Sequence, residues 1–198
     1  MQTFFVLSNY FEYIATLFGA IGVWLVIKQS VWNWWVSLVS VVIYVYVFAK
    51  AQLYADAGLQ IVYVALTFYG YYQWRYATAK QGLEIRKITT TQLLIYTVLI
   101  TIFTIVIAQV LTLLGSSMLW LDALTAAMSL IATYMMAQKQ LEHWLVWIIT
   151  DLIYVYMYFA KGLHPTAILY LVFIAMAVKG YLDWKIAVVK TEYTPISK

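Results

Sequence analysis

Two tryptophans and a carboxylate recur at helical spacing within one apolar segment, at Trp144, Trp147 and Asp151. Positions i, i+3 and i+7 share one face of a helix. Two indole rings beside a carboxylate can stack on a flat ring and favour one that carries a positive charge. A belt of interfacial aromatic residues is the alternative for the tryptophans, since they lie near one end of the segment. Trp147 with Asp151 therefore predicts a binding site, and for Trp144 both interpretations stay open.

A second polar face is predicted within residues 57–74. Gln60, Tyr63 and Thr67 follow helical spacing there, and the Gln60 amide can both donate and accept hydrogen bonds. Polar side chains in lipid also hold helices together, so ligand contact and helix packing both remain open for this face. The residues that the two faces offer for binding a substrate are Trp144, Trp147, Asp151, Gln60, Tyr63 and Thr67.

The composition excludes a soluble domain. Of the 198 residues, 65% are hydrophobic and only 10% are charged, and the mean hydropathy is +0.84. These values leave too few polar groups to coat a domain of this size in water. In a bilayer every backbone hydrogen bond must be satisfied internally, and the long unbroken apolar runs indicate helices rather than a closed barrel of alternating strands.

The residue types do not indicate catalysis or metal binding. The sequence has no cysteine, and its two histidines, His143 and His164, are expected at the surface in loops. Carboxylates do not accompany them at the spacing of a metal site. The sequence also has no Walker loop, no G-x-G-x-x-G run and no nucleophile elbow. We therefore expect a protein that is not an enzyme, with no catalytic residues, no cofactor and no metal.

Seven apolar stretches have the length of about 17 to 25 residues that spans a bilayer. They are residues 9–27, 32–49, 57–74, 92–114, 119–137, 144–160 and 166–184. The first run lacks a basic n-region and a small-residue cleavage site, so we expect a mature helix there. The sequence predicts an all-α integral membrane protein with seven transmembrane helices, forming a single transmembrane domain over residues 1–198.

Basic residues fall mainly on one side of this arrangement. That side carries Lys28, Arg75, Lys80, Arg86, Lys87, Lys139, Lys185, Lys190 and Lys198, whereas the other side carries Lys50 and Lys161. Cytoplasmic loops are enriched in Lys and Arg, which predicts a cytoplasmic C-terminus and an N-terminus outside. The basic residues are scattered at loop ends without a continuous stripe, so we expect lipid headgroups and no nucleic acid as their partners.

The chain resembles itself at a shift of about 110 residues. Matching positions are Trp34 and Trp144, 43–46 and 153–156, 70–71 and 180–181, and Trp74 and Trp184. Because four helices separate each helix from its counterpart, the copies should run in the same direction. The prediction is a parallel 3+1+3 repeat, with repeat one at 9–74, a linker helix at 92–114, repeat two at 119–184 and a cytoplasmic tail at 185–198. Transporters with such repeats bind substrate near the midplane between two halves.

Five segments carry a recognisable pattern: LYADAGLQ at 53–60, YGYYQW at 69–74, WxxWxxxD at 144–151, KGL at 161–163 and TAILY at 166–170. Together they resemble the PnuC family of bacterial vitamin transporters over nearly the whole chain. The resemblance implies a fold similar to the SWEET sugar transporters, placed in the bacterial inner membrane. It also implies that Trp144, Trp147, Gln60 and Asp151 match binding positions of the family.

The best-known members of the family carry nicotinamide riboside by facilitated diffusion, and a cytoplasmic kinase traps the vitamin. The riboside has a cationic pyridinium ring, a carboxamide and a ribose, which suit indoles, a carboxylate and an amide. Thiamine also has a cationic ring, so a transporter of thiamine or another heteroaromatic vitamin is the alternative. A membrane-embedded enzyme and a non-transporting receptor are the competing classes. The expected partners are the vitamin and the lipid bilayer, and a homo-oligomer stays open.

Overall fold

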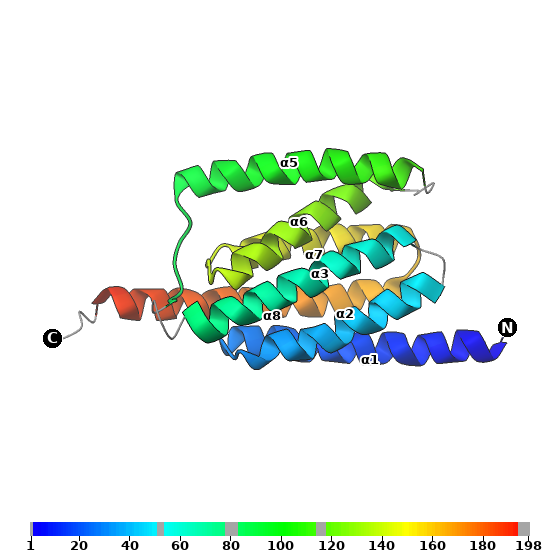
Figure 1. The fold of residues 1–198 in the computed structure, drawn as a ribbon, viewed down its shortest axis with the longest axis horizontal. Helices are drawn as coiled ribbons and strands as arrows, with labels where there is room; N and C mark the ends of the chain where they lie inside the picture. The colour runs from blue at the N-terminus through cyan, green and yellow to red at the C-terminus, as the bar shows by residue number, and fades with distance from the viewer. Residues whose placement is uncertain (1, 51–53, 78–82, 114–117, 194–198) are drawn as a thin grey trace. The chain divides into compact units, whose positions relative to one another are not determined.

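The computed structural model describes residues 2–50, 54–77, 83–113 and 118–193. Within this part the chain forms seven α-helices, which confirms the all-α prediction. They are α1 (Gln2–Ile27), α2 (Trp32–Lys50), α3 (Tyr54–Tyr72), α5 (Thr90–Thr112), α6 (Leu119–Ala137), α7 (His143–Ala160) and α8 (His164–Tyr193). The chain divides into two compact units, Met1–Gly82 with α1 to α3, and Leu83–Lys198 with α5 to α8 (Figure 1).

Several helices have the length and composition of membrane spans. Among the described residues, α5, α6, α7 and residues 166–190 of α8 qualify in full, and shorter apolar stretches occur at Thr16–Ile27 and Trp32–Tyr46. The α5 helix is the most hydrophobic of these, and few of its residues are buried. An exposed helix of this character is suited to contact with lipid.

The largest differences between the helix ends and the predicted spans are at the start of α1 and the end of α8. The α1 helix begins at Gln2 and α8 continues to Tyr193, whereas residues 9 and 184 were the predicted limits. Hydropathy marks the hydrocarbon-spanning part, and a helix can continue beyond it where its side chains turn polar. Residue 114 of the predicted linker, residues 194–198 of the predicted tail, and Lys80 lie outside the described residues.

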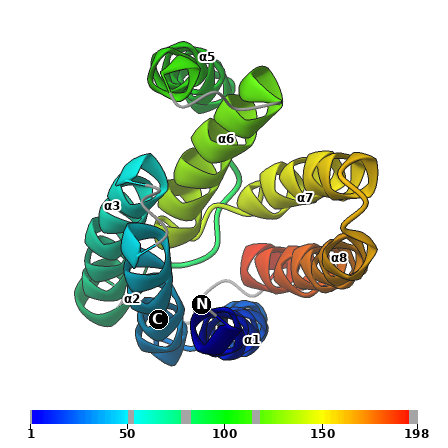
Figure 2. The same ribbon diagram turned by 90° about the vertical axis from the view of Figure 1, so that its right-hand side faces the viewer.

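The first unit is organised around α2, which packs against both α1 and α3 (Figure 2). Close approach of α1 and α2 depends on Gly22, where a Cβ atom would lie 2.6 Å from the Ser37 hydroxyl oxygen. Small residues at such contacts let membrane helices approach closely. At its C-terminal end α3 passes into a π-helical turn, η1 (Gln73–Ala77).

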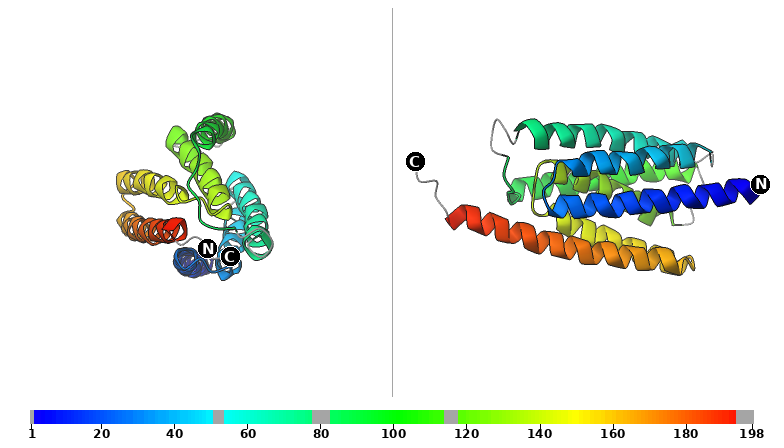
Figure 3. Two further views of the ribbon diagram at one scale, coloured as in Figure 1. Left: turned by 90° about the vertical axis from the view of Figure 1, so that its left-hand side faces the viewer. Right: turned by 90° about the horizontal axis from the view of Figure 1, so that it is seen from below.

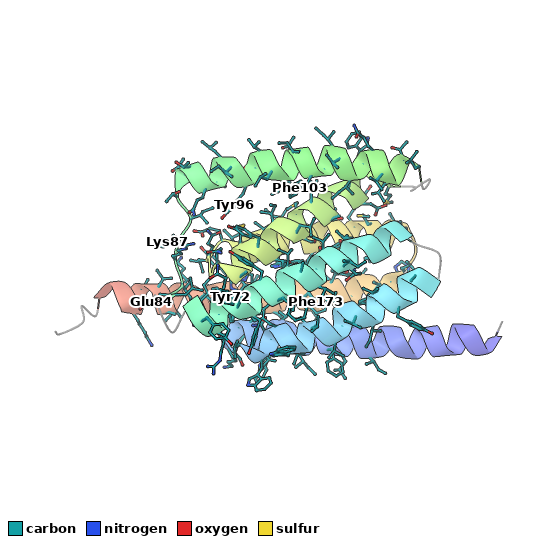
Figure 4. All side chains as sticks on the ribbon, in the orientation of Figure 1. Tyr72, Glu84, Lys87, Tyr96, Phe103 and Phe173 are labelled. Carbon is teal, nitrogen blue, oxygen red and sulfur yellow. The ribbon has the colours of Figure 1, made fainter. Side chains whose placement is uncertain are left out.

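The second unit packs its four helices in chain order, so that α6 contacts α5 and α7, and α7 contacts α8 (Figures 2 and 3). Thr89 starts α5 with a capping box, in which its hydroxyl accepts from the Gln92 amide at 3.2 Å. Tyr96 of α5 packs against Ile131 and Met135 of α6, and Figure 4 labels it on the α6 side of α5. A capped helix with one buried stripe thus covers α6.

The segment before α5 is attached to the turn between α6 and α7. The Arg86 amide donates to the Lys139 carbonyl at 3.1 Å, and the Leu141 amide donates to the Arg86 carbonyl at 2.9 Å. The Glu142 carboxylate accepts from the Ile88 amide at 2.9 Å. Burial lowers the pKa of Lys139, and the Glu84 carboxylate offsets part of that effect. These contacts hold the α6–α7 turn, and therefore the start of α7, in place.

The same helix-ending turn follows α1 and α6. Gln29 and Lys139 both adopt left-handed backbone conformations, with φ of 52° and 50°. The hydrogen bonds of the two turns are Gln29 to Val26 at 2.8 Å, Ser30 to Leu25 at 2.9 Å, Lys139 to Met136 at 3.0 Å and Gln140 to Met135 at 3.0 Å. This is the Schellman arrangement. A left-handed conformation costs a non-glycine residue about 1–2 kcal/mol, so its recurrence at matching positions indicates a required turn.

Each unit also seats a tryptophan on a glycine. In the first unit a methyl group on Gly70 would overlap the Trp34 ring, and Trp34 meets Trp74 edge to face at 5.6 Å and 90°. The corresponding set in the second unit is Trp144 against Gly180 and Trp184, with the two indoles at 5.7 Å and 88°. The residues that match across the sequence therefore make the same contacts inside each unit.

Candidate functional site

The α7 helix carries the first predicted group of binding residues in the second unit. Because α7 is regular from His143 to Ala160, Trp144, Trp147 and Asp151 lie on one face, as their spacing predicts. Trp144 and Asp151 are buried, with 2% and 5% of their surfaces exposed, and Trp147 is half-buried. The Trp147 indole and the Asp151 carboxylate are thus about one turn apart on this face.

His143 corrects the expectation that both histidines are surface residues. It begins α7 and is fully buried, with its ring centroid 4.5 Å from that of Trp144 and 4.9 Å from that of Trp184. Its Nδ1 atom is hydrogen-bonded to the Gln140 carbonyl at 2.7 Å. The α6–α7 turn folds this residue inward, which loop position alone does not reveal. His164 begins α8 and is exposed, as predicted.

Asp151 is the group whose surroundings most suggest a ligand. Its carboxylate forms no hydrogen bond or ion pair with any residue that the structure describes, although it is almost entirely buried. The neighbouring Thr150 is satisfied, since its hydroxyl donates to the Val146 carbonyl at 2.8 Å. A charged carboxylate inside a membrane costs about 2.5–3.5 kcal/mol on insertion scales. A cationic ligand would offset that cost and would find an indole, Trp147, on the same face.

A cluster of tyrosines follows Asp151, and none of its members was predicted to bind substrate. We define the tyrosine cluster as Tyr154 and Tyr158 of α7 with Tyr170 of α8. The Tyr170 ring centroid lies 4.8 Å from that of Tyr154 and 5.3 Å from that of Tyr158, the latter pair stacked at 18°. Thr125 and Ser129 of α6 are within hydrogen-bonding reach of the Tyr154 hydroxyl. Helical spacing could have indicated this cluster, because residues 147, 151, 154 and 158 lie on one face of the helix.

The second predicted group lies on α3 in the first unit. Gln60 and Tyr63 are half-buried there. Thr67 is 6% exposed, and its hydroxyl donates to the Tyr63 carbonyl at 2.8 Å. That bond satisfies the Thr67 hydroxyl within its own helix. The predicted binding residues therefore come from both units, with three on α3 and three on α7.

Metal binding finds no basis in the part of the chain that the structure describes. No three His, Cys, Asp or Glu side chains gather there at a distance suited to one ion. The chemistry available on α7 is therefore stacking on indole and phenol rings together with one carboxylate.

The chain is similar to known membrane transporters. Residues 9–186 match the family described as "Nicotinamide mononucleotide transporter". The nicotinamide riboside transporter PnuC of Neisseria mucosa is 27% identical over 184 residues, covering 86% of this chain and 70% of the relative. PnuC of Escherichia coli is 24% identical over 204 residues, covering 89% and 85%.

A relative with a different named substrate is also similar. The riboflavin/roseoflavin transporter RibM of Streptomyces davaonensis is 26% identical over 178 residues, covering 87% of this chain and 83% of the relative. Among solved structures, "Crystal structure of the Vitamin B3 transporter PnuC" superposes with a TM-score of 0.74 at 24% identity, covering 92% of this chain and 83% of that one. That structure shows the same fold.

The family match extends from α1 into α8 and so includes every residue predicted to bind substrate. Its extent confirms the family that the sequence motifs indicate. The chain is a multi-pass membrane transporter, not an enzyme, and it belongs to the nicotinamide mononucleotide transporter family, together with PnuC.

Proposed function

We propose that this chain carries nicotinamide riboside across the bacterial inner membrane by facilitated diffusion, and that phosphorylation in the cytoplasm traps the vitamin. The main support for this proposal is the state of Asp151. Its carboxylate is 5% exposed and has no cationic partner among the described residues. The riboside supplies a fixed positive charge on a flat ring. Similarity to named riboside transporters over 86% and 89% of this chain supports the same substrate.

In this proposal Trp147 stacks on the pyridinium ring and Asp151 faces its charge. Both residues depart from the internal repeat, because the positions that match them in the first half are Ser37 and Val41. Contacts shared by the two halves serve the fold, so residues that break the match are the better candidates for binding. Trp144, one turn before Trp147 on the same face, would line the buried end of the site. Gln60, Tyr63 and Thr67 remain proposed contacts from α3.

Another heteroaromatic vitamin is the second candidate. The similarity of RibM favours a flavin, and thiamine shares the cationic character of the riboside. Riboflavin has an uncharged ring, so it could meet a buried carboxylate through hydrogen bonds but could not offset its charge. Asp151 therefore supports a cationic vitamin over a flavin.

Uptake into proteoliposomes tests the proposal. Purified protein in vesicles without any ion gradient should bring labelled nicotinamide riboside to equal internal and external concentrations, with the riboside chemically unchanged. Thiamine and riboflavin are measured in parallel, and empty vesicles are the control. Transport of riboflavin alone would overturn the substrate, accumulation above the external concentration would overturn facilitated diffusion, and a chemically altered product would overturn the transporter.

The parallel 3+1+3 arrangement, similar to SWEET transporters, is part of the same proposal. Residues 9–74 and 119–184 would form the two repeats, 92–114 the linker helix and 185–198 a cytoplasmic tail. The recurring turns at Gln29 and Lys139 support it, as do the recurring tryptophan–glycine contacts. With the N-terminus outside, Lys161 faces the outer side and Glu84 the cytoplasm.

Cysteine labelling tests that orientation directly, because the natural chain has no cysteine. Lys161→Cys and Glu84→Cys each place one thiol at an exposed position outside the membrane spans. A membrane-impermeant maleimide should label Lys161→Cys in intact spheroplasts and Glu84→Cys only after permeabilisation. The cysteine-free parent is the control. The opposite pattern would invert the proposed topology.

A further inference from the structure

The tyrosine cluster is aromatic and lies next to Asp151, which suits a second binding site for the substrate. Its three rings come from two helices, and Phe173 meets Tyr170 edge to face, with the two ring centroids 5.8 Å apart. Figure 4 labels Phe173 on α8. Each member of the cluster is half-buried, so the rings are neither closed off in a core nor fully open.

The cluster continues the face of α7 that carries Trp147 and Asp151. Tyr158 lies about 10 Å along the helix axis from Asp151, at a rise of about 1.5 Å per residue. Tyr154 lies between them, near enough to Asp151 for the two groups to interact electrostatically. The side chains of Thr125 and Ser129, on α6, lie near the Tyr154 hydroxyl. A flat ring leaving the tyrosines would therefore meet Asp151 next.

Ordinary aromatic packing is the competing explanation, and the internal repeat argues against it. In the first half the matching residues are Tyr44, Phe48 and Gln60, so only the Tyr154 position keeps its tyrosine. A packing requirement shared by both halves would preserve an aromatic ring at all three positions, as it preserves the tryptophan–glycine contacts, whereas Gln60 has no ring. Tyr170 instead occupies the position that corresponds to Gln60, a predicted binding residue.

We infer that Tyr154, Tyr158 and Tyr170 form an outer binding place for a planar cationic heteroaromatic ring, ahead of the Trp147–Asp151 pair on the way in. Tyr158 and Tyr170 hold the ring by cation–π contact on the faces that they do not turn toward each other. Tyr154 then lies between this place and Asp151 along α7. The Ala160 end of α7, where the cluster lies, is the outer end in the proposed orientation. This inference rests on the proposed function and adds a second binding place to it.

The test compares two substrates in proteoliposomes, nicotinamide riboside and its reduced form, whose ring is uncharged. Tyr158→Leu and Tyr170→Leu should raise the KM of the cationic substrate about two- to thirtyfold and change the KM of the reduced form far less. Tyr170→Phe keeps the ring and should stay close to wild type. Tyr156→Leu is the matched control, since Tyr156 lies on the same helix and is 63% exposed.

The outcomes separate the inference from the proposed function. If wild-type protein fails to carry the riboside, the proposed function is wrong. If wild type carries it and both leucine variants behave like Tyr156→Leu, only the outer binding place is wrong. If the leucine variants lose thermal stability, Tyr170→Met fills the space with a flexible apolar side chain. Loss of the fold in all three non-aromatic variants, or an equal loss for both substrates, would mark the tyrosines as packing and overturn the inference.

Discussion

Replacing Asp151 by asparagine is expected to remove most nicotinamide riboside transport while leaving the fold intact. Asparagine has nearly the same shape but cannot offset the pyridinium charge. A hydrogen-bonded or paired charge contributes about 1.5–3 kcal/mol, so riboside affinity should fall about ten- to a hundredfold. Removing an unpaired buried charge should not destabilise the protein, because its burial is unfavourable. Binding is measured by calorimetry and folding by the thermal midpoint in detergent.

The reduced riboside provides the control for Asp151→Asn. Its ring has no charge, so its affinity should change little in the variant. A parallel loss for charged and uncharged ribosides would show that Asp151 acts through the fold or through hydrogen bonding. In that case the substrate's charge would not be what the carboxylate recognises.

Replacing Gly180 by alanine is expected to destabilise the second unit strongly. A Cβ atom at this position would lie 2.5–2.7 Å from three atoms of the Trp144 indole. That ring is 2% exposed and rigid, so it has little room to move aside. Overpacking of this kind typically costs about 1–3 kcal/mol. The thermal midpoint in detergent should fall, and riboside uptake should fall with it because Trp144 lies one turn before Trp147.

A matched control and a rescue make the Gly180 prediction specific. Gly58→Ala adds the same methyl group where no atom lies within 4 Å and should leave the thermal midpoint unchanged or raised. Shortening the indole with Trp144→Phe should recover part of the stability lost in Gly180→Ala. Gly70→Ala should behave like Gly180→Ala, because Trp34 occupies the equivalent place. A Gly180→Ala protein as stable as Gly58→Ala would contradict the packing described here.

The sequence predicted those features that follow from local pattern. Hydropathy located all seven helices, since each apolar run is long enough to span lipid. Self-comparison singled out Trp34 and Trp144, and the structure gives the reason, because each fills the space above a glycine of a neighbouring helix. Helical spacing also placed Trp147 and Asp151 on one face.

Features that depend on contacts distant in sequence were not predictable in this way. The attachment of Arg86 to Lys139 and Leu141 links segments that no periodicity relates. Burial of His143 follows from the turn that this attachment supports, whereas its sequence neighbourhood suggested a loop. The stacking of Tyr170 on Tyr158 requires the pairing of α7 with α8, which hydropathy does not specify.

Calorimetry of the purified protein with nicotinamide riboside, thiamine and riboflavin tests the central claim most directly. Wild type and Trp120→Ala, whose altered residue is 62% exposed on α6, should bind the riboside alike, and Trp147→Ala should lose most of that binding. Preference for the riboside together with its loss in Trp147→Ala would support the substrate and the site on α7. Riboside binding that survives in Trp147→Ala, or binding of riboflavin alone, would contradict the account.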